Sequence, residues 1–496
     1  MKILRISTTV FLLWLFVCNF SRAQIVNNMV TYGEVDFSLP LRTWDGFGFN
    51  YVQACQTFDL DKHNQDLGGF SFLDEEKKQE IINHVFGDDG LKISVLKMFL
   101  DPFHQSELNG AFDHELSTKH MLYFAKEGHK VIKTSGRDMR IISTLYGPPA
   151  YLTKQKVFRG RDLDPALKTE LALYFTDWAK YLVNEQKLPL HYLSLHNEGE
   201  SWQRWEPDGI TQEGNNTGHD YNMFWPPEQV AEFLTILPKQ LKNAGLENIK
   251  VTPGETYGWD RFYRWGYATA IAKNDKALEG LGLITSHGFY LPGSGRWNCD
   301  HTSAGIDILK EKKPELHTWT TSMSWGNMGT KLIWDIYSTI YTAKSNAVIP
   351  WAGIQVPEGW YDYDPNTGCA IWVKEDGSYE IRKGFYFYKQ LTQAGQPGMA
   401  VASTYVLNSE VVIIAFAQNE TSNPDAFILI NEGHVNYKMD IKVKGSMAKE
   451  FRAVRSSDAT ENSMELYENI GVFEIENELL RYNVPPKSVT TFFGVD

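Results

Sequence analysis

The sequence predicts an α/β protein in which a (β/α)8 TIM barrel is followed by a C-terminal antiparallel β-sandwich. Two observations support this fold class. A short apolar segment, a loop and an amphipathic helix recur in that order through residues 42–384, which is the arrangement that closes a parallel barrel. After about residue 384 the helical spacing ends, and short strand-like segments separated by turn residues follow, as is typical of a sandwich.

Each unit of the barrel is predicted from its own pattern of apolar residues. The helices carry apolar side chains three and four residues apart, as with Leu171, Phe175 and Trp178, and a pair of prolines, Pro226 and Pro227, marks one helix start. The expected strands are 44–50, 92–99, 139–146, 191–197, 249–254, 283–289, 316–322 and 347–355. The expected helices are 74–86, 115–133, 165–186, one that begins after the two prolines, 260–278, 304–312 and 330–344.

The trailing region is expected to form a separate β-sandwich. Its expected strands are 400–416, 426–432, 437–443, 450–455, 471–475 and 488–494. The alternating segment 31–41 is expected to join it, because a chain that begins and ends in one module ties down both termini. The predicted domains are therefore a barrel over residues 42–384 and a sandwich made of residues 30–41 and 385–496.

Residues 1–23 are predicted to be a signal peptide. Two basic residues open the segment, 10–17 is an apolar run too short to span a membrane, and cleavage is expected near Ala23. The pattern predicts a secreted or periplasmic protein with no membrane span. Lipid attachment at Cys18 is the alternative, which is disfavoured because Val17 stands where a small residue is usual.

Composition narrows the classes of partner. The formal net charge is −13 and no basic block stands out, which argues against binding to nucleic acid. Cys55, Cys299 and Cys369 remain after cleavage, and their spacing fits no metal motif. No glycine-rich loop of the kind that cradles phosphates is present, so no metal or cofactor is predicted. An aromatic content of 14% fits either large cores or a cleft that stacks on sugar rings.

The candidate proton donor is Glu198. It follows the alternating segment 191–195, so its carboxyl and the amide of Asn197 are expected at the C-terminal mouth of a strand, where barrels of this class carry their chemistry. A carboxyl can protonate a glycosidic oxygen, the amide can bind a hydroxyl, and Trp202 or Trp205 could stack on a sugar. The alternative for an isolated Asn-Glu pair is a helix cap before a surface turn.

Other expected strand ends carry amides, carboxylates and aromatic rings that would converge on the same mouth. The candidate substrate-binding residues are Asn197, Asp101, Tyr146, His287, Tyr290, Trp325 and Trp351. Structural alternatives stay open for several of them. Asp101 precedes Pro102 and could simply begin a turn, His287 could be a core histidine, and Tyr290 and Trp351 could pack at the barrel mouth.

Several motifs occur in a characteristic order. They are Trp44-Asp45-Gly46-Phe47-Gly48 at the first expected strand, residues 146–152 after the third, Asn197-Glu198 after the fourth, residues 287–290 on the sixth and Trp319 in the seventh. In this order they resemble clan A glycoside hydrolases, most closely family 30, with the related family 59 nearby. The resemblance covers residues 30–496. It implies a retaining glycosidase in which Glu198 is the acid/base and Asn197 binds the 2-hydroxyl of the sugar.

The seventh strand departs from that family pattern. The resemblance implies a nucleophilic Glu just after Trp319, but Ser322 occupies the expected place and no carboxylate lies between Thr318 and Ile333. Glu315 lies at the opposite end of the strand, roughly 23 Å away at the rise of an extended chain. A neutral hydroxyl does not stabilise an oxocarbenium-like transition state as a carboxylate does.

Three interpretations remain open for this site. A carboxylate at another strand end could act with Glu198, and Glu255 is the preferred candidate, ahead of Asp101 and Glu358. A wide separation of the two carboxylates would leave room for water and would predict inversion. Alternatively, water or a substrate group attacks with only Glu198 assisting, or the barrel binds carbohydrate without hydrolysing it. Glu255 could also cap a nearby helix, and Glu200 is expected to be exposed.

Overall fold

The computed structural model describes residues 30–53, 66–211, 221–290, 300–323, 329–356, 369–458 and 464–495. The chain divides into two compact units, each described by itself below. One consists of Asp45–Met328 and Asp335–Phe385, and the other of Met1–Trp44, Gly329–Trp334 and Tyr386–Asp496. The predicted signal peptide, including Ala23 and Cys18, lies outside the described residues.

The first unit is a barrel of eight parallel strands, which confirms the predicted fold class. In the order of the sheet, the strands are β6 (Lys250–Thr252), β5 (Leu190–Ser194), β4 (Arg140–Leu145), β3 (Val95–Leu100), β2 (Gly46–Asn50), β9 (Ala347–Val348), β8 (Thr318–Thr320) and β7 (Ile284–Ser286). A parallel bridge from Val251 to Leu281 and a hydrogen bond of 2.9 Å from Gly282 N to Val251 O lie between β6 and the segment that leads into β7, so the ring is nearly closed.

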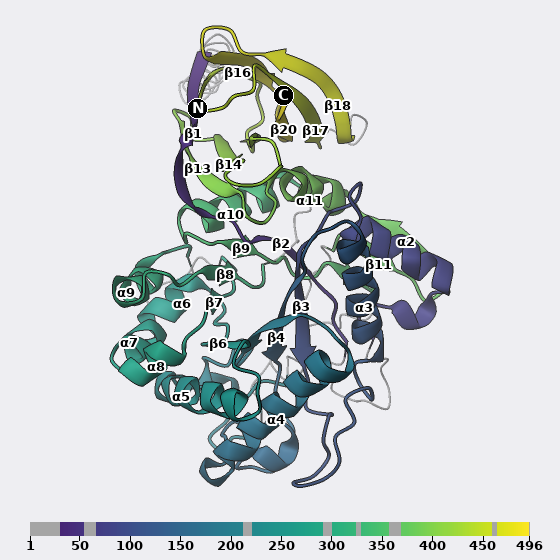
Figure 1. Cartoon of the computed structure of the whole chain (residues 1–496), viewed down its shortest axis with the longest axis vertical. Helices are drawn as coiled ribbons and strands as arrows, with labels where there is room; N and C mark the ends of the chain where they lie inside the picture. Colours follow the sequence, from purple (N-terminus) through teal and green to yellow (C-terminus); the bar gives the residue numbers. More distant parts are fainter. Residues whose placement is uncertain are drawn as a thin grey trace, which may run out of the picture. The chain divides into compact units, whose positions relative to one another are not determined.

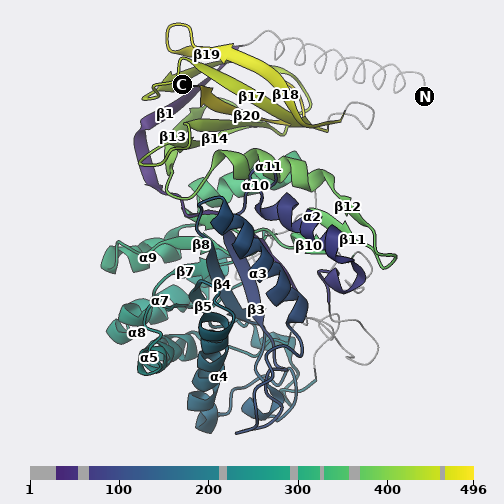
Figure 2. The ribbon, with the colours of Figure 1, turned by 45° about the vertical axis from the view of Figure 1, so that its right-hand side comes forward.

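Helices surround these strands (Figures 1 and 2). They are α2 (Glu75–Phe86), α3 (Lys119–Thr134), α4 (Lys168–Lys180), α5 (Pro227–Asn243), α9 (Ala304–Lys312) and, partly in this unit, α10 (Thr330–Tyr341). Side chains from several strands fill the barrel interior, among them Val95, Ile142, Leu283, Trp319 and Ile349. Within the described part of the chain, none of the helices combines the length and apolar character needed to cross a membrane.

The prediction of one helix over 260–278 is wrong. Three short helices occupy this stretch: α6 (Trp259–Arg264), α7 (Tyr267–Ala272) and α8 (Asp275–Gly280). Gly266 separates the first two with a φ of 92°, a left-handed conformation that continues no right-handed helix. Asn274 starts the third, because its side chain accepts a hydrogen bond from Ala277 N.

The predicted eighth strand, 347–355, is also wrong in its second half. Only β9 belongs to the barrel, and β10 (Ile354–Gln355) instead pairs with β11 (Ile371–Val373), which pairs with β12 (Tyr379–Ile381). Backbone hydrogen bonds from Ile349 N to Thr320 O at 2.8 Å and from Trp351 N to Met323 O at 2.5 Å still hold the chain beside β8, and Gly353 N then donates to Asn50 Oδ1 at 2.8 Å. The chain therefore leaves the barrel wall after Trp351.

The second unit contains the predicted C-terminal sandwich. Its strands form one sheet of nine, in the order β18 (Glu465–Glu474), β17 (Glu450–Ser457), β20 (Ser488–Val495), β15 (Ala426–Asn431), β14 (Val411–Ala417), β13 (Ala400–Val406), β1 (Val30–Thr43), β16 (Tyr437–Lys444) and β19 (Leu479–Val484). The pairs are antiparallel except β1 with β16. The expected strand 400–416 is two strands, because Asn408 and Glu410 form a turn between them. Strand β19 and helix α11 (Lys383–Ala394) were not predicted.

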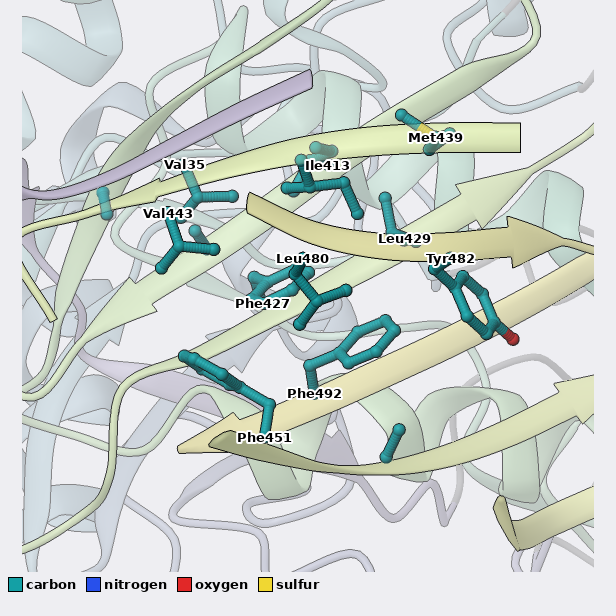
Figure 3. Packing of buried hydrophobic residues seen from close by; sticks show 14 of the residues in the cluster. Val35, Ile413, Phe427, Leu429, Met439, Val443, Phe451, Leu480, Tyr482 and Phe492 are labelled. Carbon is teal, nitrogen blue, oxygen red and sulfur yellow. The ribbon is translucent and has the colours of Figure 1, made fainter. Parts of the chain in front are cut away.

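This sheet folds over its own core. Phe427, Phe451, Leu480 and Phe492 point toward one another from four different strands (Figure 3). The rings of Phe427 and Phe492 are stacked with centroids 4.6 Å apart. The two edge strands meet across the core, since Phe473 on β18 packs against Tyr482 on β19 at 5.3 Å. A single sheet thus provides both layers of the sandwich.

Candidate active site

The backbone beyond β5 and β6 places Glu198 and Glu255 side by side. Asn197 forms a parallel bridge with Glu255 past the ends of both strands. Glu255 N donates to His196 O at 2.8 Å, and Glu198 N donates to Glu255 O at 2.7 Å. The ladder of the barrel therefore continues far enough to fix both glutamates at its C-terminal end, as predicted from the strand pattern.

A glycine and a histidine make this close approach possible. Gly254 has a φ of 90°, and a β-carbon there would lie 2.2 Å from Cδ2 of His196, so only glycine fits. Burial lowers the pKa of His196 to about 3, so its ring is neutral. The neutral ring accepts a hydrogen bond of 3.1 Å from Gly199 N at Nδ1, which shapes the turn that follows Glu198.

Glu198 is held in an uncommon backbone conformation. Its φ is 48°, in the left-handed region that a residue with a β-carbon rarely adopts. Asn222 Nδ2 donates to Glu198 O at 3.2 Å and helps to hold it. The residue is 6% exposed, and its two carboxylate oxygens have different partners: Oε1 lies 3.0 Å from His287 Nδ1, and Oε2 accepts from Arg204 at 3.0 Å.

Glu255 lies deeper, with no exposed surface. Its Oε2 accepts hydrogen bonds from Lys97 Nζ at 2.5 Å and from His287 Nε2 at 3.0 Å, and its Oε1 accepts from Thr144 Oγ1 at 2.7 Å. Burial alone would raise the pKa of Glu255, but the charge of Lys97 and the hydrogen bond from His287 outweigh it and lower the pKa to about 2. Glu255 is therefore an anion at neutral pH.

His287 joins the two glutamates. Its ring lies between them, with one nitrogen 3.0 Å from each carboxylate. Burial would lower the pKa of His287, but the hydrogen bonds to Glu198 and Glu255 raise it above its ordinary value. An imidazole ring and two contacts of 3.0 Å therefore link the two carboxylates.

Ser322 is buried at the end of β8, close to this cluster. Its backbone oxygen accepts from Gly288 N at 2.7 Å, and Lys97 Nζ donates to the neighbouring Thr321 O at 3.2 Å. Lys97 thus links Glu255 to the point where the resemblance implies a nucleophile.

A mechanism-based covalent label, such as a 2-fluoro glycosyl fluoride, is expected to leave Ser322 unmodified. A serine hydroxyl is a weak nucleophile without an adjacent base to take its proton, and its neighbour Lys97 donates hydrogen bonds to Glu255 and Thr321. Peptide mapping by mass spectrometry checks this, and a labelled peptide containing Ser322 would overturn it.

The second glutamate of the loop, Glu200, is buried and not exposed as expected. Its side chain accepts from Arg261 at 2.8 Å and from Tyr257 N at 3.1 Å. Apolar surroundings tolerate such a charge because it is paired. Of the two tryptophans considered for stacking, Trp205 is buried with its indole N–H bonded to Arg159 O at 2.6 Å, whereas Trp202 is 50% exposed.

The other candidate residues lie in varied surroundings. Asp101 is buried and accepts hydrogen bonds from Ser117 Oγ at 2.7 Å and from Phe103 N at 2.8 Å, the second being a turn contact. Tyr146 and Trp351 both pack on Phe99, with ring centroids at 4.6 and 6.0 Å. Tyr290 is 53% exposed. Their roles in substrate binding stay predictions, and Trp325 and Glu358 lie outside the described residues.

Sequence reasoning missed Lys97, Thr144 and Arg204. A signal existed for Lys97, which is a single charge in the otherwise apolar run of β3 and therefore has to be paired inside the barrel. The other two gave no comparable signal. In the described residues, no group of three or more His, Cys, Asp or Glu side chains is arranged to hold a metal ion.

Solved structures share this architecture along nearly the whole chain. The catalytic domain of GH30 xylanase C from Talaromyces cellulolyticus is 16% identical, with 94% of this chain and 100% of that chain covered and a TM-score of 0.69. A GH30 endoxylanase from Clostridium papyrosolvens C71 is 17% identical, with 94% and 100% covered and a TM-score of 0.66. An endo-β1,6-glucanase is 15% identical, with 94% of both chains covered and a TM-score of 0.65.

The chain has the fold of family 30 glycoside hydrolases. The predicted resemblance to clan A is confirmed at the level of this fold. No protein-family model matches the sequence, and comparison with curated proteins gave no match. In a family 30 fold, the mouth of the barrel at the C-terminal strand ends is the place for chemistry, and Glu198, Glu255 and His287 meet there.

Proposed function

We propose that this protein is a secreted glycoside hydrolase that cleaves O-glycosidic bonds in a poly- or oligosaccharide, with Glu198 as the general acid/base. The observation that carries the proposal is the pairing of Glu198 with His287 at the C-terminal end of a glycoside hydrolase barrel. A buried carboxyl with a hydrogen-bonded histidine beside it is equipped to give a proton to a glycosidic oxygen and take one back.

The surrounding residues have separate roles in this proposal. Asn197 binds the hydroxyl next to the reacting carbon, and Tyr146, Tyr290 and Trp351 offer apolar faces to the sugar rings. Asp101 and Trp325 are further candidates for contact with the substrate. In this proposal Glu255 acts through His287, whose Nε2 lies 3.0 Å from Oε2 of Glu255, and not as a nucleophile. Water is then the attacking group.

The proposed substrates are β-linked plant or microbial polysaccharides, since two of the similar structures are xylanases and a third is an endo-β1,6-glucanase. Export is supported by the leader pattern of residues 1–23. A neutral glycan also fits the negative net charge of the chain, because its binding needs no basic surface.

Incubation with xylan, β1,6-glucan and xyloglucan is expected to release new reducing ends from at least one of them. Released oligosaccharides are measured by a reducing-sugar assay and identified by mass spectrometry. If a glycan raises the melting temperature of the protein but none is cleaved, the barrel is a carbohydrate-binding protein without hydrolytic activity, and the proposal is wrong.

A further inference from the structure

We propose that His287 holds the proton that Glu198 delivers, and that Glu255 and Lys97 are positioning residues that keep His287 protonated. The inference rests on the proposed role of Glu198 as proton donor. It explains why four buried side chains form a hydrogen-bonded row. Lys97 Nζ lies 2.5 Å from Glu255 Oε2, which lies 3.0 Å from His287 Nε2, and Nδ1 of His287 lies 3.0 Å from Glu198 Oε1.

A count of protons supports the assignment. His287 makes one hydrogen bond to each carboxylate, and each bond needs a hydrogen atom between nitrogen and oxygen. Since Glu255 is ionised beside Lys97, its bond takes a proton from Nε2 of His287. The second hydrogen lies in the bond between Nδ1 of His287 and Oε1 of Glu198. A proton is therefore always one hydrogen bond away from the acid.

The site needs such a supply because of its charges. In a retaining glycosidase the negative nucleophile helps to keep the acid protonated, but here the seventh strand offers Ser322 instead. Arg204 also contacts Glu198 at 3.0 Å, and a neighbouring cation favours the ionised carboxylate. Both features make protonation of Glu198 less favourable, and a protonated His287 compensates because it can pass a proton to that carboxylate.

The charges around His287 agree with a protonated ring. Two carboxylates contact it directly, and their attraction outweighs burial and the repulsion from Lys97. His196 faces the same cluster but is neutral. Among the described residues, the ring interacts with Glu198, Glu255, Lys97 and His196, and Arg204 acts on it through its ion pair with Glu198.

The reaction balances without another reactant. Nδ1 of His287 passes its proton to Oε1 of Glu198, and the resulting carboxylic acid protonates the glycosidic oxygen as the bond to the anomeric carbon breaks. Once the leaving group has moved away, water bonds to that carbon on the side of Glu198, and its extra proton returns through Glu198 to Nδ1 of His287. The net change is addition of one water across the glycosidic bond.

The protonation state of His287 can be measured on the full-length wild-type protein. With ¹⁵N-labelled histidine, NMR is expected to show both ring nitrogens of His287 protonated at pH 7.5, whereas His196 stays neutral and serves as the internal control. The resonances are assigned by their loss in His287→Gln. A neutral His287 at pH 7.5 overturns the inference, and the measurement needs no substrate.

A second measurement separates a proton supply from a structural role. The double variant Lys97→Met with Glu255→Gln removes both buried charges together, and its hydrolysis of the glycan cleaved by the wild type is followed from pH 5 to 9. The basic limb of kcat/KM is expected to move to lower pH by roughly 1 unit, because His287 loses a hydrogen-bonded anion whose effect on its pKa is larger than the opposing repulsion from Lys97. An unmoved basic limb contradicts the inference.

The two proposals fail in different ways. If Glu198→Gln hydrolyses glycan at the wild-type rate, the proposed function is wrong, even when His287 is protonated. If that variant is inactive while His287 is neutral, Glu198 remains the acid and only the proton supply is refuted.

Discussion

Replacing Glu198 by Gln is expected to lower the rate of glycan hydrolysis by about 10²–10⁴-fold, because general acid catalysis contributes an effect of that size. Gln keeps the shape of the side chain, and its amide oxygen can accept from Arg204 while its NH2 group donates to a neutral Nδ1 of His287, so the fold should persist. Initial rates of reducing-sugar release measure the effect, and circular dichroism confirms that the variant is folded. Glu247→Gln is a matched control, since Glu247 is exposed and lies before β6, at the end of that strand opposite to Glu255.

The leaving group sharpens this test. A dinitrophenyl glycoside releases a stable phenolate that hardly needs a proton, so Glu198→Gln should lose far less activity on it than on the polysaccharide. Equal losses on both substrates would mean that Glu198 binds substrate but does not protonate the leaving group. Wild-type turnover of the polysaccharide by the variant would remove Glu198 from the mechanism.

The fold could be predicted where each element has its own local pattern. Helix α9 spans Ala304–Lys312, the predicted range, because its ends coincide with changes in apolar spacing. The predicted elements fail where the structure is determined by the conformation of a single residue or by a pairing partner distant in sequence. Gly266 breaks a helix through its φ angle, and Ile354 leaves the barrel because it pairs with Ile371. Neither choice can be read from hydrophobic periodicity alone.

Three members of the candidate site were predictable, but Lys97, Thr144 and Arg204 and the connections between the side chains were not. The rule that barrel chemistry lies at strand ends selected Glu198, Glu255 and His287, which lie within hydrogen-bonding distance in a row. The residue spacing in the sequence could not predict that His287 would lie between the two glutamates, because this position depends on the tilt of the strands and on how deep each side chain lies in the barrel. The same limit explains Glu200, whose burial follows from its pairing with Arg261.

Lys97→Met is expected to lower the free energy of unfolding by about 3–5 kcal/mol, the cost of leaving one member of a buried ion pair without its partner. Lys97 and Glu255 are both fully buried and lie 2.5 Å apart. Methionine fills a similar volume, so the loss reflects the uncompensated charge of Glu255 rather than a cavity. Urea denaturation at pH 7.5 measures the change.

The pH dependence and a double variant identify the cause of that loss. The pKa of Glu255 in the folded wild type is about 2, below its ordinary value of 4.5, so this group stabilises the fold above pH 4.5 and the contribution is lost as the pH falls toward 2. Without Lys97, burial favours the protonated carboxyl of Glu255. Acidification from pH 7.5 to 5 should therefore reduce the difference in the free energy of unfolding between Lys97→Met and the wild type.

A second substitution tests the same cause. Adding Glu255→Gln to Lys97→Met removes the unpaired buried charge and should restore most of the lost stability. If the single and double variants are equally unstable at both pH values, the buried pair is not what Lys97 contributes, and packing inside the barrel explains its position.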